Sequence, residues 1–201
     1  MSGNRLGILI SGRGSNFEAI AKSIAANRLQ ASIAVVISNR PEAPGLDIAR
    51  ALAIPAIGLP SKGVAREDYD AMLVGELQSQ DVDLVCLAGF MRLLTAEFIQ
   101  AFPQRILNIH PSLLPAFPGL NAQAQALSCG VKVTGCTVHF VDEDLDSGPI
   151  VAQAAVPVSN DDTVETLSAR ILQEEHRIYS EAVGRILSGH WHVRGRRVEF
   201  E

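Results

Sequence analysis

The stretch Ile106-Leu107-Asn108-Ile109-His110-Pro111-Ser112-Leu113-Leu114-Pro115 decides the fold class and the candidate site together. Its first residues are apolar and partly β-branched, which is typical of a short buried strand. The prolines that follow cannot extend a strand or a helix, so the strand is predicted to stop at His110. Because strand side chains alternate between faces, Asn108 and His110 point the same way. In an open parallel sheet, ligands bind at the carboxyl ends of the strands.

Asn108 and His110 have complementary chemistry. The amide can donate a hydrogen bond, and the imidazole can give or take a proton near neutral pH. Together they make half of an acyl-transfer site. A loop pair that forms only local hydrogen bonds is the alternative, and the two residues alone do not decide between these interpretations.

Composition limits the class of protein. A length of 201 residues suits one sizeable α/β domain, and the 47% hydrophobic content predicts a well-filled core. The net charge of -5 argues against nucleic-acid binding. No apolar run is long enough for a membrane span, and Met1 to Arg5 leads directly into a strand, so a cytoplasmic protein is expected. Three cysteines without C-x-x-C spacing indicate neither disulfides nor a zinc site.

A strand, a tight glycine loop and a helix are predicted near the start, where Leu6 to Ile10 is followed by Ser11-Gly12-Arg13-Gly14-Ser15-Asn16. Glycines allow close approach of the backbone, and the free N–H groups at a helix start favour an anion. A dinucleotide site would need a third glycine where Phe17 stands and an acidic residue after the strand Ile33 to Ile37. A single phosphate therefore fits better, and a purely structural turn is the alternative.

Strands and helices alternate along the chain, which predicts an α/β fold with a mostly parallel twisted sheet and helices on both faces. The strand Val82 to Ala88 has no alternation and is expected at the centre of the sheet. A basic turn is expected at Arg194 to Arg197. Further strands are predicted at Pro55 to Leu59, Val131 to Val141, Ile150 to Val158 and Trp191 to Val193, and helices at Pro44 to Leu52, from Arg66 onward, at Ala122 to Leu127 and at Thr163 to Leu187.

Two loops carry open alternatives. The apolar loop Gly89 to Leu94 suits one wall of a pocket for a flat aromatic ligand, or it packs in the core. The acidic segment Asp142 to Pro149 is not a calcium loop, because its glycine falls one place late and Gln153 stands where a glutamate is needed. It is either a solvated turn or a turn that aims one carboxylate at the imidazole.

Five motifs, taken in order, resemble those of the phosphoribosylglycinamide formyltransferases, also called glycinamide ribonucleotide transformylases. The match runs in order across nearly the full length of the chain. The resemblance implies a Rossmann-like formyltransferase fold and an enzyme of purine biosynthesis that moves a formyl group from 10-formyltetrahydrofolate to the amine of glycinamide ribonucleotide. The motifs are Ile10-Ser11-Gly12-x-Gly14-Ser15-Asn16, Ala88-Gly89-Phe90-Met91-Arg92, Leu107 to Pro115, Pro118-Gly119 and Leu145-Asp146-x-Gly148-Pro149.

The resemblance also implies a single domain over residues 1–201, with a ribonucleotide side at about 1–105, a folate side at about 106–201 and the active site at their junction. It leaves a homodimer open. Arg66, in Arg66-Glu67-x-Tyr69, is expected beside the phosphate by its motif and is also counted with the folate residues. The implied catalytic residues are Asn108, His110 and Asp146; the ribonucleotide residues are Gly14, Ser15, Asn16 and Glu175; the folate residues are Arg66, Met91, Arg92, Leu93, Leu94, Asn108, Val141, Asp142, Glu143, Asp144, Leu145 and Asp146.

The residue types suit this chemistry. Attack of an amine on a formyl carbon creates an oxyanion, to which the Asn108 amide and a protonated His110 can donate hydrogen bonds. The leaving folate nitrogen needs a proton, which an imidazole can deliver directly or through water, and Asp146 would orient that imidazole. No metal is expected. His139 is predicted to be a packed or hydrogen-bonded structural residue.

One departure and several alternatives remain. Many family members carry histidines after Pro118-Gly119, where this chain has Asn121 and Gln123. A formyltetrahydrofolate hydrolase or a methionyl-tRNA formyltransferase would share the fold but usually carries a further domain. A non-catalytic folate or nucleotide binding module, or a structural domain, would be expected to lack one of the three catalytic residues.

Overall fold

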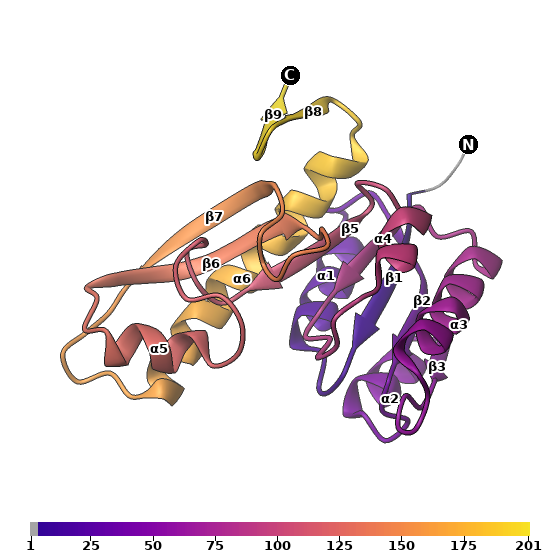
Figure 1. Cartoon of the computed structure of the whole chain (residues 1–201), viewed down its shortest axis with the longest axis horizontal. Coiled ribbons are helices and arrows are strands. Elements are labelled where there is room, and N and C mark those ends of the chain that lie inside the picture. The colour runs from indigo at the N-terminus through magenta and orange to yellow at the C-terminus, as the bar shows by residue number, and fades with distance from the viewer. Residues whose placement is uncertain (1–3) are drawn as a thin grey trace. The chain divides into compact units, whose positions relative to one another are not determined.

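The structure is a computed structural model that describes residues 4–201. It contains two compact units, Met1–Leu107 and Asn108–Glu201 (Figure 1). Strand β5, Ile106–His110, begins in the first unit and ends in the second. Met1 to Arg5 was predicted to lead directly into the first strand; Met1 to Gly3 lie outside the described residues.

The first unit is built on parallel strands in the order β3-β2-β1-β4. β1 and β4 are buried along nearly their whole length, because an apolar run without alternation can be covered on both faces. The strands are β1 (Arg5–Ile10), β2 (Ser32–Ser38), β3 (Ala56–Gly58) and β4 (Leu84–Leu87), and the helices are α1 (Ser15–Ala25), α2 (Pro44–Ala51), α3 (Arg66–Ser79) and α4 (Ala96–Ala101).

Helices cover both faces of these strands. From β1 the chain moves outward to β2 and β3, and it then returns to place β4 on the other side of β1. Since crossovers between parallel strands are right-handed, this reversal puts the returning helix on the opposite face from the first two. Accordingly, α1 contacts α2, and α3 contacts α4.

The second unit contains antiparallel as well as parallel pairs. β6 (Val133–Phe140) and β7 (Ile150–Pro157) are antiparallel, and β9 (Arg197–Phe200) lies parallel to β7 and antiparallel to β8 (Trp191–Arg194). The antiparallel arrangement of β6 and β7 follows from their connection, because residues 141–149 are too few for a crossover to a parallel strand. The sheet pairs of the whole chain are nevertheless mostly parallel, which confirms the predicted fold class.

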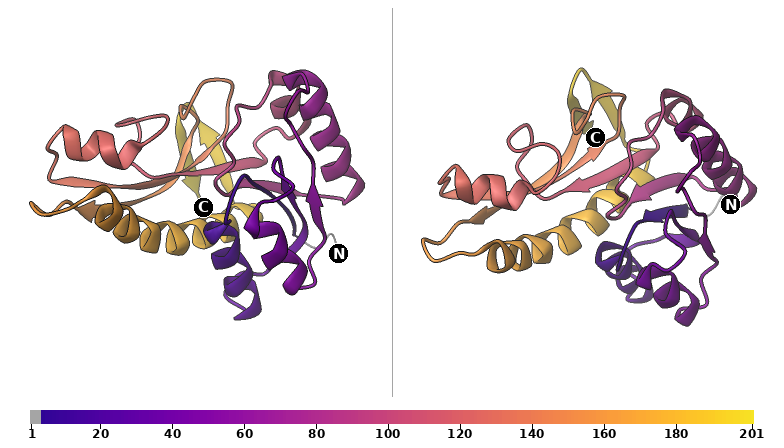
Figure 2. Two further views of the ribbon diagram at one scale, coloured as in Figure 1. Left: turned by 90° about the horizontal axis from the view of Figure 1, so that it is seen from below. Right: turned by 60° about the horizontal axis from the view of Figure 1, so that its bottom comes forward.

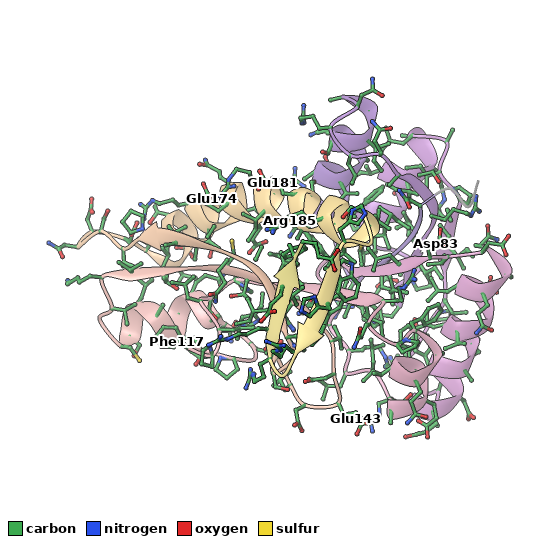
Figure 3. All side chains as sticks on the ribbon, turned by 90° about the horizontal axis from the view of Figure 1, so that it is seen from above. Asp83, Phe117, Glu143, Glu174, Glu181 and Arg185 are labelled. Carbon is green, nitrogen blue, oxygen red and sulfur yellow. The ribbon has the colours of Figure 1, made fainter. Side chains whose placement is uncertain are left out.

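Two helices complete the second unit. α6 (Val164–Leu187) packs against β6 and β7 and also contacts α5 (Ala122–Ser128) (Figure 2). It begins with a capping box in which Thr163 and Thr166 satisfy each other's backbone N–H groups. Glu174, Glu181 and Arg185 follow one another along it (Figure 3), and Arg177 forms ion pairs with both glutamates.

The C-terminal hairpin of β8 and β9 is attached to the rest of this unit by aromatic contacts. The ring of Trp191 lies 5.1 Å from that of Phe140, and its indole N–H donates to the Ile186 carbonyl. Arg185 lies over the Phe200 ring at 3.5 Å. In both views of Figure 2 the hairpin runs beside the connection between β6 and β7.

Two elements were not predicted, α4 and β9. α4 is short, and the basic turn predicted at Arg194 to Arg197 is the tip of a hairpin whose second strand continues to Phe200. The remaining predicted strands and helices are confirmed, with ends that move by a few residues. Within residues 4–201, no helix has the length and apolar character needed to cross a membrane.

Candidate functional site

The loop after β1 has the backbone expected of an anion site. Gly14 precedes α1 in the left-handed conformation, with φ 73°, and no side chain caps this helix. The first N–H groups of α1 carry the partial positive charge of a helix start. Ser15 is half-buried as the first helical residue, and Asn16 is buried. Phe17 is fully buried in the core, so the third glycine of a dinucleotide site has no counterpart.

Ser11 ties this loop to two others in the first unit. Its hydroxyl donates to Asn39 Oδ1 at 2.6 Å and accepts from the Met91 N–H at 2.8 Å. Its own N–H donates to the Gly89 carbonyl. The loops that follow β1, β2 and β4 are thus joined at the carboxyl ends of their strands, as predicted for a ligand-binding edge.

The charges of Arg66 and Arg92 both act on Asp70 in the first unit. Arg66 is the exposed first residue of α3, and Arg92 lies over the Tyr69 ring at 4.6 Å. The Tyr69 hydroxyl donates to the Leu59 carbonyl, and burial raises its pKa to about 12. Asp70 is buried and accepts the Thr95 N–H at 2.6 Å; burial raises the pKa of this carboxyl.

The loop that contains Arg92 exposes apolar side chains. Met91 is 63% exposed and Leu93 58% exposed, whereas Leu94 is half-buried. The loop therefore has two parts: Phe90 packs in the core, whereas Met91 and Leu93 face solvent. Exposed apolar residues of this kind are available to a flat apolar ligand.

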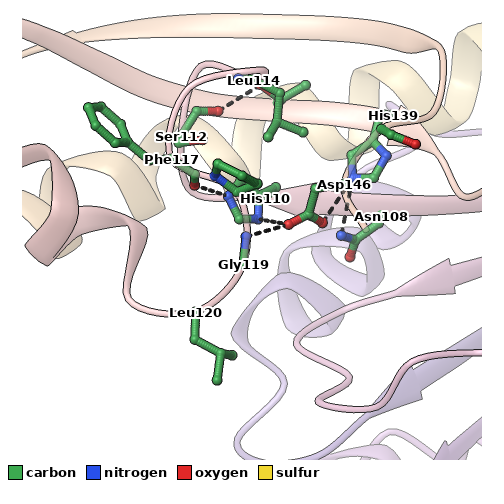
Figure 4. Close-up of polar contacts among 12 residues, drawn as sticks. Asn108, His110, Ser112, Leu114, Phe117, Gly119, Leu120, His139 and Asp146 are labelled. Carbon is green, nitrogen blue, oxygen red and sulfur yellow. Dashed lines mark hydrogen bonds and ion pairs between the residues drawn. The ribbon is translucent and has the colours of Figure 1, made fainter. Parts of the chain in front are cut away.

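His110 and Asp146 meet at the carboxyl end of β5 (Figure 4). The distance between His110 Nδ1 and Asp146 Oδ2 is 3.3 Å, and both side chains are at least nine-tenths buried. His110 Nε2 lies 2.9 Å from the Phe117 carbonyl, which can only accept. Both ring nitrogens of His110 face acceptors. In the imidazolium form both nitrogens carry a hydrogen, so both of these hydrogen bonds can form at the same time.

Asp146 is held in place by its backbone and by a neighbouring loop. Its φ of 51° is in the left-handed region, which aspartate tolerates better than most residues. Its Oδ2 accepts the Gly119 N–H at 2.7 Å. The acidic segment is therefore not merely a solvated turn: it directs one carboxylate at the imidazole, which was one of its two interpretations.

Asn108 and His139 form the second pair of this cluster. Asn108 Nδ2 lies 3.2 Å from His139 Nε2, and His139 Nδ1 lies 2.8 Å from the Phe140 carbonyl. The carbonyl requires an N–H on Nδ1, which leaves Nε2 as the acceptor for Asn108. Burial lowers the pKa of His139, in agreement with this neutral form. The amide of Asn108 is thereby oriented and keeps a second N–H to donate.

His139 is the member of the cluster whose place sequence reasoning missed. The prediction that His139 is packed or hydrogen-bonded is confirmed, since only 2% of it is exposed and its ring lies within hydrogen-bond distance of Asn108. Its Nε2 is also 3.8 Å from Asp146 Oδ1, so it belongs to the same constellation as the catalytic candidates. The available signal was a histidine in an apolar strand that ends at the acidic segment.

The connection between β6 and β7 has a polar and an apolar part. Asp142 accepts a hydrogen bond from the Ser147 hydroxyl, and it is half-buried, as is Val141. Glu143 and Asp144 are exposed. Leu145, next to Asp146, is 56% exposed.

Glu175 is a buried residue of α6, and the charge of its carboxylate affects the pKa of Cys136 in β6. Burial raises the pKa of the Cys136 thiol to about 12, with the Glu175 carboxylate as the second cause. Cys136 is therefore a neutral thiol at physiological pH. All three cysteines are free, and among residues 4–201 there is no cluster of three or more His, Cys, Asp or Glu side chains suited to a metal ion.

The structure thus joins the three predicted catalytic side chains within the second unit. The other candidates divide between the two units. Gly14, Ser15, Asn16, Arg66 and Met91 to Leu94 belong to the first unit, and Val141 to Leu145 and Glu175 belong to the second.

Comparisons with known proteins identify the family. Residues 4–183 match the formyl transferase family. The trifunctional purine biosynthetic protein adenosine-3 of Drosophila melanogaster is 47% identical over 92% of this chain, which spans 14% of that protein. Phosphoribosylglycinamide formyltransferase of Bacillus subtilis (strain 168) is 40% identical over 91% of this chain and 94% of its own length.

A solved structure agrees closely with this fold. Glycinamide ribonucleotide transformylase 1 from Symbiobacterium toebii superposes with a TM-score of 0.97 at 53% identity, over 99% of this chain and 94% of that one. The family match, the sequence relatives and the solved structure all indicate formyl transferases. The chain belongs to the formyl transferase family.

Proposed function

We propose that this protein transfers the formyl group of 10-formyltetrahydrofolate to the amine of glycinamide ribonucleotide, a step of purine biosynthesis. The relatives that match nearly end to end carry this activity in their names. The observation that carries the proposal is the contact between His110 and Asp146 at 3.3 Å, beside an oriented Asn108 amide. No metal takes part in the proposed steps.

The first step is attack of the ribonucleotide's amine nitrogen on the formyl carbon. The carbonyl π electrons move to oxygen, and a tetrahedral centre with an oxyanion forms. Asn108 can donate its second amide N–H to that oxygen, since its first is held by His139. Fixed donors are effective because they require no reorganisation as the charge develops; the loss of one typically costs on the order of 10²- to 10³-fold in rate.

The second step is breakage of the bond between the formyl carbon and the folate nitrogen. The departing nitrogen needs a proton, and the attacking amine must lose one. His110 in its imidazolium form holds two protons, directed at Phe117 and Asp146. One of these two hydrogen bonds must break, so that its proton passes to the leaving nitrogen, directly or through water. The proton released by the amine then returns the imidazole to its cationic form.

The ribonucleotide is proposed to bind through its phosphate to the N–H groups at Gly14, Ser15 and Asn16. A phosphate fits there because the start of α1 carries partial positive charge, and Gly14 before it has no side chain that would obstruct an anion. Glu175 is proposed to hold the ribose. Folate is proposed to bind to the residues already grouped for it: Arg66, Met91, Arg92, Leu93, Leu94, Asn108, Val141, Asp142, Glu143, Asp144, Leu145 and Asp146.

A cytoplasmic location, a homodimer and a single domain with its active site between the two halves stay predictions. Formyltetrahydrofolate hydrolase is the principal competing activity, because water could replace the amine in the first step. A binding module without catalysis is the other alternative. Presence of Asn108, His110 and Asp146 in one cluster favours an enzyme.

An absorbance assay separates these activities. The purified chain is mixed with 10-formyl-5,8-dideazafolate, with and without glycinamide ribonucleotide. Release of deformylated folate only when the ribonucleotide is present is the expected result. Equal release without it would identify a hydrolase, and ligand binding without release in either mixture would identify a binding module.

A further inference from the structure

The loop Phe117–Asn121 is held in a costly backbone conformation. Phe117 has φ 54° and Asn121 φ 57°, both in the left-handed region that side chains with a Cβ rarely adopt. Gly119 between them has φ 78°, which glycine accepts without strain. Strained residues of this kind persist only where surrounding contacts fix them, and they gather at functional sites.

This loop contacts both members of the acid pair. The Phe117 carbonyl accepts from His110 Nε2 at 2.9 Å, and the Gly119 N–H donates to Asp146 Oδ2 at 2.7 Å (Figure 4). Leu120, by contrast, is 74% exposed and extends away from the cluster. The loop's main chain therefore sets the orientation of the imidazole and the carboxylate.

Gln125 on α5 is the side chain that holds the middle of the loop. Its Nε2 donates to the Leu120 carbonyl at 2.9 Å and to the Pro118 carbonyl at 3.2 Å. These two carbonyls flank Gly119, whose N–H reaches Asp146. One amide group thus fixes both neighbours of the residue that touches the carboxylate.

We propose that Gln125 is a positioning residue for the proposed formyl transfer: by bridging the Pro118 and Leu120 carbonyls it keeps Gly119 on Asp146 and Phe117 on His110. The expected effect of Gln125 on turnover rests on the proposed function. Its expected effect on the conformation of the loop does not. Gln125 itself touches no reacting group.

The Gln125→Glu variant is the sharpest test. Glutamate has nearly the same size as glutamine, but its ionised carboxylate has no hydrogen to donate and repels two carbonyl oxygens. The kcat is expected to fall about tenfold, since small displacements of catalytic groups can cost up to about 10²-fold. The KM for the ribonucleotide should stay within about twofold, because binding through a phosphate loop is not changed. Gln125→Ala should behave similarly.

Gln123→Glu is the matched control. It introduces the same charge on the same helix two residues earlier, at a half-buried position. It should leave kcat and the thermal midpoint close to those of the natural protein. An equal loss of kcat in both variants would assign the effect to charge on α5 and would overturn the proposal.

The Gly119 amide gives a readout that does not depend on activity. In a ¹H–¹⁵N NMR spectrum its proton should resonate far downfield and exchange slowly, because it is bonded to a carboxylate. In Gln125→Glu it should move upfield and exchange faster, whereas in Gln123→Glu it should not move. A fall in kcat with an unmoved Gly119 resonance, or a moved resonance with unchanged kcat, would refute the positioning role. If the natural protein had no transferase activity, this resonance would still report on the hold of Gln125 over the loop.

Discussion

The candidate site groups of the two units are of different kinds: main-chain groups in the first unit and side chains in the second. In the first, the loop after β1 offers main-chain N–H groups, and the side chain that shapes it, Ser11, only ties loops together. In the second, a chain of pairwise contacts links His110 to Asp146, Asp146 to His139 and His139 to Asn108; Asn108 is half-buried and the other three side chains are buried. A main-chain site binds an anion by shape and tolerates many side chains, whereas a site that moves protons depends on each titratable group. Binding and chemistry should therefore be separable by mutation.

The largest effect is expected from His110→Ala. General acid–base groups typically contribute about 10²- to 10⁴-fold, so kcat should fall by at least about 100-fold. The dissociation constant of glycinamide ribonucleotide should change little, because the phosphate is proposed to bind the main chain of the first unit. Steady-state kinetics and isothermal titration measure the two quantities.

Near-normal turnover of His110→Ala would remove the imidazole from the mechanism. Loss of binding in proportion to turnover would contradict the separation between the two units. Because His110 is 95% buried, a thermal unfolding curve must first show that the variant is folded.

Ser15→Glu should produce a smaller effect of the opposite kind. A carboxylate at the first position of α1 would occupy the anion site and repel a phosphate. The dissociation constant of the ribonucleotide should rise about tenfold or more, as expected for about 1.4 kcal/mol of repulsion. The kcat at saturating ribonucleotide should change by less than about threefold.

Ser15→Gln is the neutral control for bulk. If the glutamine and glutamate variants weaken binding equally, size and not charge is responsible. An unchanged dissociation constant in Ser15→Glu would place the phosphate elsewhere.

His139→Gln is expected to change folding stability, not binding or turnover, and the change depends on pH. Burial lowers the pKa of His139 below its usual 6.5, so the folded protein keeps it neutral while the unfolded chain takes up a proton as pH falls through about 6.5. This histidine therefore supports folding most above that pH and less below it. Glutamine does not titrate. The natural protein should exceed the variant by about 1 to 3 kcal/mol at about pH 7.5, because a buried hydrogen bond is disturbed.

That difference in free energy of unfolding should shrink at about pH 5.5. Urea unfolding of both proteins at the two pH values measures it. A difference that is constant with pH would mean that His139 is protonated to the same extent in the folded and unfolded chains.

The sequence predicted the parallel unit better than the second unit, for a physical reason. Strands such as Leu6 to Ile10 are buried on both faces and are recognised from composition alone. The pairing of β6 with β7 depends on the length of their connection, and β9 follows a basic turn with no apolar run. The first unit has one missed element, α4, which is short and whose start depends on Thr95, whose hydroxyl accepts the Phe98 N–H.

For the site, local reasoning predicted that Asn108 and His110 share a face, and the family resemblance added Asp146. Neither could predict that His139 orients Asn108, because that contact joins residues 31 positions apart. Nor could sequence predict Gln125, whose role depends on a loop with three residues at positive φ. Contacts set by unusual backbone conformations leave little trace in hydrophobic patterns.

The stacking of Trp191 on Phe140 has an experimental consequence. Trp191 is the sole tryptophan of the chain, so tryptophan fluorescence, excited selectively over the two tyrosines, comes from a single known place. Its ring partner is the next residue after His139 and supplies the carbonyl that selects the His139 tautomer. The emission intensity and lifetime of Trp191 thus report, without a label, on the surroundings of Phe140 and His139. Stopped-flow mixing can follow changes there in real time when a ligand is added.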